Sequence, residues 1–374
     1  MATGAAAAAH ASRLPLRHRL LASPRFQRWA AAFPLTRPVA RRRARALFDL
    51  CAGFVYSQTL LAAVRLGLCE ALMEGPQPLD QLAQRLSLPQ DATARLLRAS
   101  TALKLTDQRR DGRFALGSLG AALVGNPGIA AMVRHHALFY DDLRDPVALL
   151  RDEAGPLALR QLWQYAGHDR PQELLAEEVA RYSDLMAGSL PLVAAELLAA
   201  YRFDRHRRLL DAGGGDGAFL SAVATAAPDL QLVLFDLPAV ADRARARFAR
   251  EGLARRARAE GGDLRTGRWP EGADIVSLVR VIHDHDDGAA LAILRGARQA
   301  LRAGGTLLLA EPMSETPGAA PVGAYFEFYL LAMGSGRPRT AAELEGLMRK
   351  AGFARVRSVG TRQPMLVQLL VGQC

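Results

Sequence analysis

A glycine-rich stretch at residues 211–217 has the composition of a loop that brings its backbone close to a ligand. It reads D-A-G-G-G-D-G, after an apolar stretch and before a helical pattern. Glycine permits close approach, and the free N–H groups of a helix N-terminus can bind a ligand. Because Gly213, Gly215 and Ala218 also satisfy the dinucleotide pattern G-x-G-x-x-G/A, the loop alone leaves NAD and S-adenosylmethionine open. Asp236, at the end of the next apolar stretch, supplies a carboxylate for ribose hydroxyls in either case.

These stretches fall in a part of the chain that alternates short apolar strands with helices. The predicted strands are Arg208–Ala212, Leu230–Asp236, Ala257–Gly261, Asp274–Val279, Thr306–Glu311, Phe353–Val359 and Met365–Gly372. The alternation predicts a doubly wound α/β sheet, and the short polar turn before the last strand makes the final two strands pair antiparallel. This hairpin is typical of class I methyltransferases and absent from ordinary dinucleotide domains. The predicted fold is therefore a Rossmann-like methyltransferase sheet in residues 201–374.

The preceding part of the chain predicts an all-helical domain over residues 47–200. Leu47–Leu72 has the spacing of a buried or interfacial helix that could contribute to a dimer. Two short helices at Leu79–Leu86 and Ala92–Leu103, followed by a hairpin at Thr106–Leu116, resemble a winged helix. The second of these helices has no run of Lys, Asn or Gln that could reach base edges, so dimerisation is favoured over DNA binding.

Residues 1–46 form a basic arm that is expected to be partly disordered. Residues 1–48 hold ten arginines and no acidic residue, so the 38 basic residues elsewhere nearly balance the 37 acidic ones. The net charge of +11 therefore belongs to the arm, and no nucleic-acid partner is expected. With Phe26, Trp29 and Phe33 the arm could dock on anionic lipid, and a solubilising or dimer-contacting arm is the alternative.

The chain is expected to lie in the cytoplasm and to cross no membrane. No window approaches the ~20 uncharged apolar residues that a membrane-spanning helix needs. Cys51, Cys69 and Cys374 are an odd number without C-x-x-C spacing, which argues against disulfides and a zinc site.

Five motifs resemble those of the cation-independent small-molecule O-methyltransferases, the family of the caffeic-acid and acetylserotonin methyltransferases. They are D-A-G-G-G-D-G, F-D-L-P, G-G-D-L, R-V-I-H-D and L-A-E-P, in the family's order. The resemblance covers about residues 47–374. It implies S-adenosylmethionine as the methyl donor, no metal and a homodimer.

The resemblance also implies roles for individual residues. The implied cofactor-binding residues are Asp211, Gly213, Gly215, Asp236, Asp263, Leu264 and Arg280. His283 is the implied catalytic base, since a neutral imidazole at a strand end can take the proton of an alcohol, and Glu311 is the carboxylate that orients it. A solvated loop histidine is the alternative reading. Metal binding by His283–Asp287 is disfavoured because adjacent residues on a strand end point apart.

Two positions depart from the family pattern. The family carries a second glutamate before Arg339-Thr340, where this chain has Pro338, and a tryptophan where this chain has His285. Proline cannot hold a histidine ring through a hydrogen bond. The departures speak against a phenolic acceptor.

The acceptor is expected to be apolar. Ala130–Tyr140, which includes His135 and His136, and Val322–Met333 are mostly apolar and could either line a pocket or form core. The stretches G-S-G-R-P-R-T, R-F-Q-R-W, P-L-T-R-P and F-D-L-x-A-G-F-V-Y-S-Q resemble the hydroxyneurosporene and demethylspheroidene O-methyltransferases of purple phototrophic bacteria. This implies methylation of the tertiary C1 hydroxyl of an acyclic carotenoid, at the inner face of a photosynthetic membrane. One alternative is a phenolic or polyketide acceptor, and the other is a non-catalytic DNA-binding regulator. The intact His283 argues against the regulator.

Overall fold

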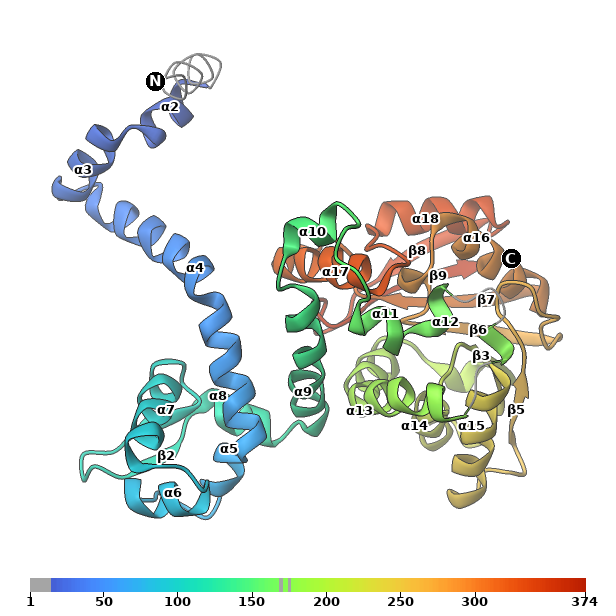
Figure 1. Cartoon of the computed structure of the whole chain (residues 1–374). Coiled ribbons are helices and arrows are strands. Elements are labelled where there is room, and N and C mark those ends of the chain that lie inside the picture. Colours follow the sequence, from blue (N-terminus) through green and yellow to red (C-terminus); the bar gives the residue numbers. More distant parts are fainter. Residues whose placement is uncertain (1–14, 168–170, 174–175) are drawn as a thin grey trace. The chain divides into compact units, whose positions relative to one another are not determined.

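The computed structural model describes residues 15–167, 171–173 and 176–374 (Figure 1). It divides into two compact units, Met1–Ala121 and Ala122–Cys374. The first residues of the arm, where disorder is predicted, lie outside the described ranges.

The first unit consists of helices and a small antiparallel pair of strands. Its elements are α2 (Leu16–Ala22), α3 (Pro24–Ala32), α4 (Arg37–Leu66), α5 (Leu68–Ala71), α6 (Leu79–Arg85), α7 (Gln90–Ala102), β1 (Thr106–Gln108) and β2 (Phe114–Leu116). α8 (Ser118–Val124) spans the division between the units. α6, α7 and the β1–β2 pair correspond to the predicted helices and hairpin, and Leu68, Leu82 and Leu97 lie in their common core.

Helix α4 begins earlier than predicted. It starts at Arg37 and ends at Leu66, and the next residue, Gly67, has a φ of +67°, the left-handed conformation that commonly follows a helix. Pro38 does not interrupt it, because a first-turn residue has no N–H partner to lose. The predicted boundary between arm and domain at residue 46 therefore falls inside one continuous helix.

Most of α4 is exposed in the single chain. Its buried residues, Leu61, Ala63 and Val64, all lie near its C-terminal end. The large apolar side chains of its middle are 64% to 81% exposed, and they are Leu47, Phe48, Leu50 and Phe54. By length and composition alone, α4 could cross a membrane, and it is the one helix of the described chain that meets this test. The helix contains Asp49, so it does not contradict the expectation that no window of about 20 uncharged apolar residues exists.

The second unit is a sheet with helices on both faces (Figure 1). Its strands are β3 (Arg208–Ala212), β4 (Gln231–Asp236), β5 (Ala257–Gly261), β6 (Ala273–Val279), β7 (Leu301–Glu311), β8 (Arg355–Val359) and β9 (Gln368–Gln373). The strand order is β5-β4-β3-β6-β7-β9-β8, with β9 antiparallel to both neighbours. This confirms the predicted methyltransferase sheet. The order reverses between β3 and β6, where a crevice opens at the C-terminal strand ends.

The second unit also contains the helices that pack on this sheet and on one another. They are α9 (Pro127–Asp142), α10 (Pro146–Leu150), α11 (Ala158–Leu162), α12 (Gln164–Gly167), η1 (Pro171–Glu173), α13 (Ala176–Ala200), η2 (Phe203–Arg205), α14 (Ala218–Ala226), α15 (Pro238–Arg250), η3 (Ile282–Asp284), α16 (Asp287–Ala300), α17 (Ala320–Met333) and α18 (Ala341–Lys350). Leu209 packs toward α13, α14 and α15, and Leu210 toward α16 and α18. Both faces of the sheet are thus buried, which explains why the strands are continuous apolar runs in the sequence.

Helix α13 differs from the sequence-based expectation in two ways. It continues through Pro191, a residue type that usually breaks a helix, because packing on α9 and α14 holds the helix across the missing hydrogen bond. The same packing groups residues 122–200 with the sheet, whereas composition had suggested a domain boundary at residue 200.

Candidate functional site

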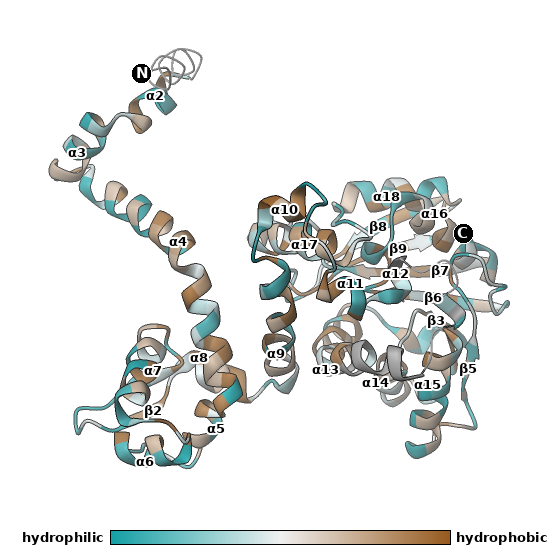
Figure 2. Cartoon of the chain, in the orientation of Figure 1, coloured by the Kyte–Doolittle hydropathy of each residue, from teal (hydrophilic) through white to brown (hydrophobic). Residues whose placement is uncertain are grey.

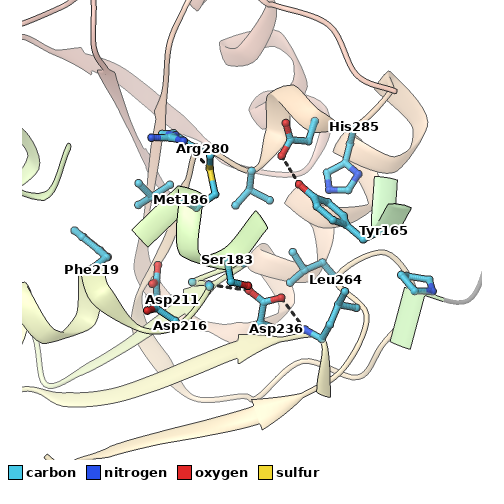
Figure 3. Close-up of a pocket in the computed structure, with 18 of the residues that line it drawn as sticks. Tyr165, Ser183, Met186, Asp211, Asp216, Phe219, Asp236, Leu264, Arg280 and His285 are labelled. Atoms are coloured by element: carbon cyan, nitrogen blue, oxygen red, sulfur yellow. Dashed lines mark hydrogen bonds between the residues drawn. The ribbon is translucent and has the colours of Figure 1, made fainter. Parts of the chain in front are cut away.

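The predicted cofactor-binding residues all line one pocket in the second unit (Figure 3). These residues are Asp211, Gly213, Gly215, Asp236, Asp263, Leu264 and Arg280. They come from the ends of β3, β4 and β6 and from the loop after β5. Side chains that the sequence did not single out complete the wall, among them Trp163, Tyr165, Ser183, Met186 and Phe219.

The loop after β3 has a backbone that favours glycine at residues 213–215. Gly213 and Gly215 have φ of +70° and +60°, which other residues rarely adopt. A Cβ on Gly213 would lie 2.6 Å from a methyl carbon of Val281, and one on Gly214 would lie 2.4 Å from Oδ2 of Asp211. The bare backbone therefore forms a cradle at the pocket floor.

The buried carboxylate of Asp211 and the partly buried carboxylate of Asp236 face this cradle. Asp236 accepts hydrogen bonds from the N–H groups of Gly215 at 2.8 Å and Leu237 at 2.7 Å, yet burial raises its pKa to about 6. Burial also raises the pKa of Asp211 to about 7, while a 2.6 Å hydrogen bond from Ser277 lowers it and the charge of Asp236 raises it. Both carboxylates would be stabilised by donors from a ligand.

The pocket fits S-adenosylmethionine. Oδ2 of Asp211 and Oγ of Ser183 are buried without a hydrogen-bond partner among the described residues. Buried polar atoms are normally paired, so these two point to a ligand that carries polar groups. An amino group could donate to Asp211 and ribose hydroxyls to Asp236.

Two of the predicted cofactor residues also make contacts within the protein. Asp263 accepts from the backbone N–H of Arg265 at 2.8 Å and from its Nη2 at 3.1 Å. Arg280, at φ +58°, donates to Oγ of Ser189 at 2.9 Å and to Sδ of Met186 at 2.7 Å. Burial lowers the pKa of Arg280. These contacts fix both side chains in the wall.

His283 and Glu311 contact each other at the ends of β6 and β7. Nδ1 of His283 lies against Oε2 of Glu311. Oε1 of Glu311 accepts the N–H groups of Val281 at 3.0 Å and Ile282 at 2.7 Å. β6 and β7 are parallel neighbours, so their C-terminal ends bring the ring and the carboxylate together. Neither residue is among those lining the pocket, although Asp284 next in the chain is.

The loop that departs from the family pattern supports the backbone of His283. A Cβ on Gly336 would lie 2.1 Å from the carbonyl oxygen of His283, which also accepts the N–H of Arg337 at 3.0 Å. The buried Arg339 donates to the carbonyl oxygens of Ile282 and His285 at 2.8 and 2.7 Å. Pro338 offers the ring no polar side chain. The loop therefore positions the peptide chain of His283.

Charge and burial act in opposite directions on His283. Burial lowers its pKa, but the charges of Asp284 and Glu311 raise it, and the pKa ends above its ordinary value. Nε2 lies 3.1 Å from Oδ1 of Asp284. Oδ2 of Asp284 in turn accepts from the hydroxyl of Tyr165 at 2.6 Å (Figure 3).

Tyr165 and Ser183 were not predicted from the sequence, and Asp284 was a candidate there only as a metal ligand. Tyr165 lies on a four-residue helix that carries no motif, so no local signal could have identified it. Among the described residues there is no group of three or more His, Cys, Asp or Glu side chains that could hold a metal ion.

His135 and His136 pair with tyrosines of α17. Nε2 of His135 lies 2.7 Å from the hydroxyl of Tyr329, and Nε2 of His136 lies 2.8 Å from that of Tyr325. Burial, with a smaller effect of His136, lowers the pKa of His135 to about 4. These aromatic pairs belong to the apolar cluster around α9 and α17.

Comparison with known proteins agrees with this geometry. A family model described as an O-methyltransferase domain matches residues 140–354, and one described as an O-methyltransferase dimerisation domain matches residues 48–126. The demethylspheroidene O-methyltransferase of Cereibacter sphaeroides is 44% identical over 345 residues, covering 91% of this chain and 89% of that protein. The enzyme of the same name from Rhodobacter capsulatus is 40% identical over 360 residues, covering 94% and 88%.

Solved structures of similar proteins have the same fold. The mitomycin 7-O-methyltransferase MmcR is 27% identical with a TM-score of 0.72, covering 90% of this chain and 100% of that one. CalO1, a methyltransferase in calicheamicin biosynthesis solved with SAH bound, is 30% identical with a TM-score of 0.71, covering 88% and 98%.

Proposed function

Because the chain belongs to the S-adenosylmethionine-dependent O-methyltransferases, we propose that it methylates the tertiary C1 hydroxyl of an acyclic hydroxylated carotenoid. The observation that carries the proposal is identity of 44% and 40%, over most of the chain, to two demethylspheroidene O-methyltransferases. The pocket supports it, since its glycine cradle and buried carboxylates suit the methyl donor.

The cofactor-binding roles follow from the chemistry of the pocket wall. S-adenosylmethionine supplies an electrophilic methyl group on a sulfonium centre. Asp211 accepts from its amino group and Asp236 from its ribose hydroxyls, while Gly213 and Gly215 leave room for the ligand beside the backbone.

The other end of the pocket receives the nucleobase. Asp263 and Leu264 face the adenine, and Arg280 lies beside it. The contacts of Asp263 with Arg265 and of Arg280 with Ser189 support fixed positions for these side chains. A fixed wall favours transfer because orientation of the reacting groups removes a large entropic cost.

His283 acts as the general base in this proposal. A tertiary alcohol is far less acidic than a phenol and does not ionise before attack, so its proton must leave during methyl transfer. Glu311 takes a hydrogen bond from Nδ1, which leaves the lone pair of Nε2 to accept that proton. The carboxylate also stabilises the imidazolium that results.

We further propose that the protein is a homodimer. The match to a dimerisation domain at residues 48–126 supports this, as do the exposed apolar side chains of α4 within that range. Figure 2 shows apolar segments along α4. A second copy would remove them from water, which is the main driving force for association.

The arm before this region is proposed to contact the inner face of a photosynthetic membrane. Trp29 and Phe33 are 52% and 40% exposed, and their stacked rings lie 5.2 Å apart. Arginines surround them, and residues 1–48 contain no acidic side chain. Exposed aromatic rings beside arginine favour an anionic lipid surface, where a carotenoid would be dissolved.

An acceptor panel tests the proposed function. The protein is incubated with methyl-labelled S-adenosylmethionine and detergent-dispersed carotenoids, phenols and hydroxynaphthoates. Label in the 1-hydroxy carotenoid supports the proposal, and label in the phenols alone would replace the carotenoid with a phenolic acceptor.

A further inference from the structure

The imidazole of His283 lies between two carboxylates. Glu311 contacts Nδ1 from β7, and Oδ1 of Asp284 lies 3.1 Å from Nε2. The His283 side chain is 11% exposed, so neither charge is fully screened by solvent. The ring therefore has an anionic partner at each nitrogen.

Asp284 is held in position by other parts of the fold. Its Oδ2 accepts from the hydroxyl of Tyr165 at 2.6 Å, and its backbone carbonyl accepts from Oγ of Ser335 at 2.6 Å. The carboxylate lines the pocket together with Tyr165. A carboxylate fixed at both the side chain and the backbone keeps its charge beside the ring.

The position of the family's second glutamate does not perform this task. Pro338 stands there without a polar side chain, and the neighbouring Arg337 donates its backbone N–H to the carbonyl oxygen of His283. A second carboxylate at the ring must therefore come from another element. Asp284 on η3 meets this requirement.

We propose that Asp284, held by Tyr165, is the second carboxylate that stabilises the charged form of His283. Its Oδ1, 3.1 Å from Nε2, stabilises by its charge the imidazolium that forms during methyl transfer. The inference rests on the proposed function, in which His283 is the base. It adds a residue pair to that site.

The proton and electron balance of the step is complete without another reactant. The O–H bond of the acceptor breaks as its proton moves to Nε2 of His283. The oxygen electron pair forms the new bond to the methyl carbon, and the electrons of the old methyl–sulfur bond stay on sulfur. The new imidazolium then lies between Glu311 and Asp284.

The charged groups around His283 come from several elements. Asp284 lies on η3, Glu311 on β7, and Arg280 and His285 flank η3 in the chain. Phe326 of α17 presents an uncharged ring, with centroids 5.6 Å apart. Burial and Arg280 lower the pKa of His283, and Asp284 and Glu311 raise it. Removing the charge of Asp284 should therefore lower it.

The decisive experiment is an NMR titration of the His283 imidazole in the full-length protein without acceptor. The His283 signal is assigned by its loss in His283→Gln. We expect the pKa to fall by about one pH unit in Asp284→Asn, since one of two nearby opposite charges is lost. Asp284→Glu should keep the pKa raised. Asp286→Asn is the matched control, because this exposed carboxylate caps α16 and asparagine retains that capping.

Turnover supplies the second readout. With saturating acceptor, kcat of Asp284→Asn should fall about tenfold. The pH below which kcat declines should also become lower, because the pKa of His283 is lower. The affinity for S-adenosylmethionine should stay within twofold of the wild-type value. Tyr165→Phe should lower kcat severalfold without changing the pH below which kcat declines, since the carboxylate of Asp284 remains. Should Asp284→Asn fail to fold, Asp284→Ser removes the same charge in a smaller side chain and carries the same test.

The titration separates this inference from the proposed function. A lowered His283 pKa in Asp284→Asn supports the inference even if carotenoids are not accepted, because no acceptor is present. An unchanged pKa, or an equal fall in Asp286→Asn, overturns it even if carotenoids are methylated.

Discussion

Glu311 holds both the ring and the backbone of the segment that carries His283. One oxygen contacts Nδ1 of the ring, and the other accepts the N–H groups of Val281 and Ile282 at 3.0 and 2.7 Å. The carboxylate thereby fixes which ring nitrogen carries the proton and where the other nitrogen lies. Glu311 at the end of β7 thereby supports η3, the segment beyond β6 that carries His283.

Replacing His283 by alanine should lower kcat by about 10²-fold or more, because no group would take the proton of the alcohol during transfer. Affinity for S-adenosylmethionine should stay nearly unchanged, since His283 does not line the pocket of the described residues. Steady-state kinetics and calorimetry measure the two effects. Unimpaired turnover would assign the base elsewhere, and loss of wild-type activity in chelator would revive the metal reading.

Replacing Asp236 by alanine should weaken S-adenosylmethionine binding by roughly 1 to 3 kcal/mol, because the ribose hydroxyls would lose a buried partner. Calorimetry of the full-length protein measures this difference. Asp242→Ala is the matched control, since this carboxylate lies exposed on α15 and pairs with Arg245. Equal affinity of the wild-type protein for NAD would contradict the assignment of the pocket.

The buried His135 should make the free energy of unfolding depend on pH. Burial lowers its pKa to about 4, below the value of about 6.5 in the unfolded chain, so unfolding takes up a proton between these limits. Its stabilising contribution is complete above about pH 6.5 and is lost as the pH falls toward 4, by on the order of 3 kcal/mol.

Urea denaturation at several pH values tests this dependence. Between pH 6.5 and 4, the free energy of unfolding should fall less in His135→Gln than in the wild-type protein. This holds whatever the effect of the substitution at neutral pH. His18→Gln, on the exposed arm, is the control. The same slope in His135→Gln and in the wild-type protein would show that another group causes the acid sensitivity.

The arm should confer binding to anionic membranes. The full chain should sediment with anionic liposomes at low salt, and a chain that begins at Leu47 should do so much less, because exposed charge attraction is screened within ~8 Å at physiological ionic strength. The full chain with Arg17, Arg19, Arg25 and Arg28 changed to glutamine keeps α4 intact and should show the same loss. Equal sedimentation of all three proteins would favour a dimer contact for the arm.

Much of the sheet could be predicted from the sequence. β3 and β5 begin and end at the predicted residues, because short strands bounded by charged residues and glycine leave little freedom of assignment. The grouping of the predicted cofactor residues in one pocket wall was also predictable, since parallel strands bring their C-terminal ends to one crevice.

Features set by tertiary packing could not be predicted in this way. Proline usually breaks a helix, but Pro38 lies in a first turn and Pro191 in a helix supported by its neighbours. Tyr165 and Asp284 are 119 residues apart in sequence, and their hydrogen bond depends on how α12 packs beside η3. No local pattern carries that information.

Transfer of labelled methyl from S-adenosylmethionine to a carotenoid that carries the C1 hydroxyl tests the central claim most directly. It is compared with transfer to the same carotenoid without that hydroxyl, for the wild-type protein and for His283→Ala. The predicted result is label in the hydroxylated carotenoid with the wild-type protein, little with His283→Ala, and none in the carotenoid that lacks the hydroxyl. Absence of label from the hydroxylated carotenoid, while a phenol in the same tube is methylated, would contradict the claim.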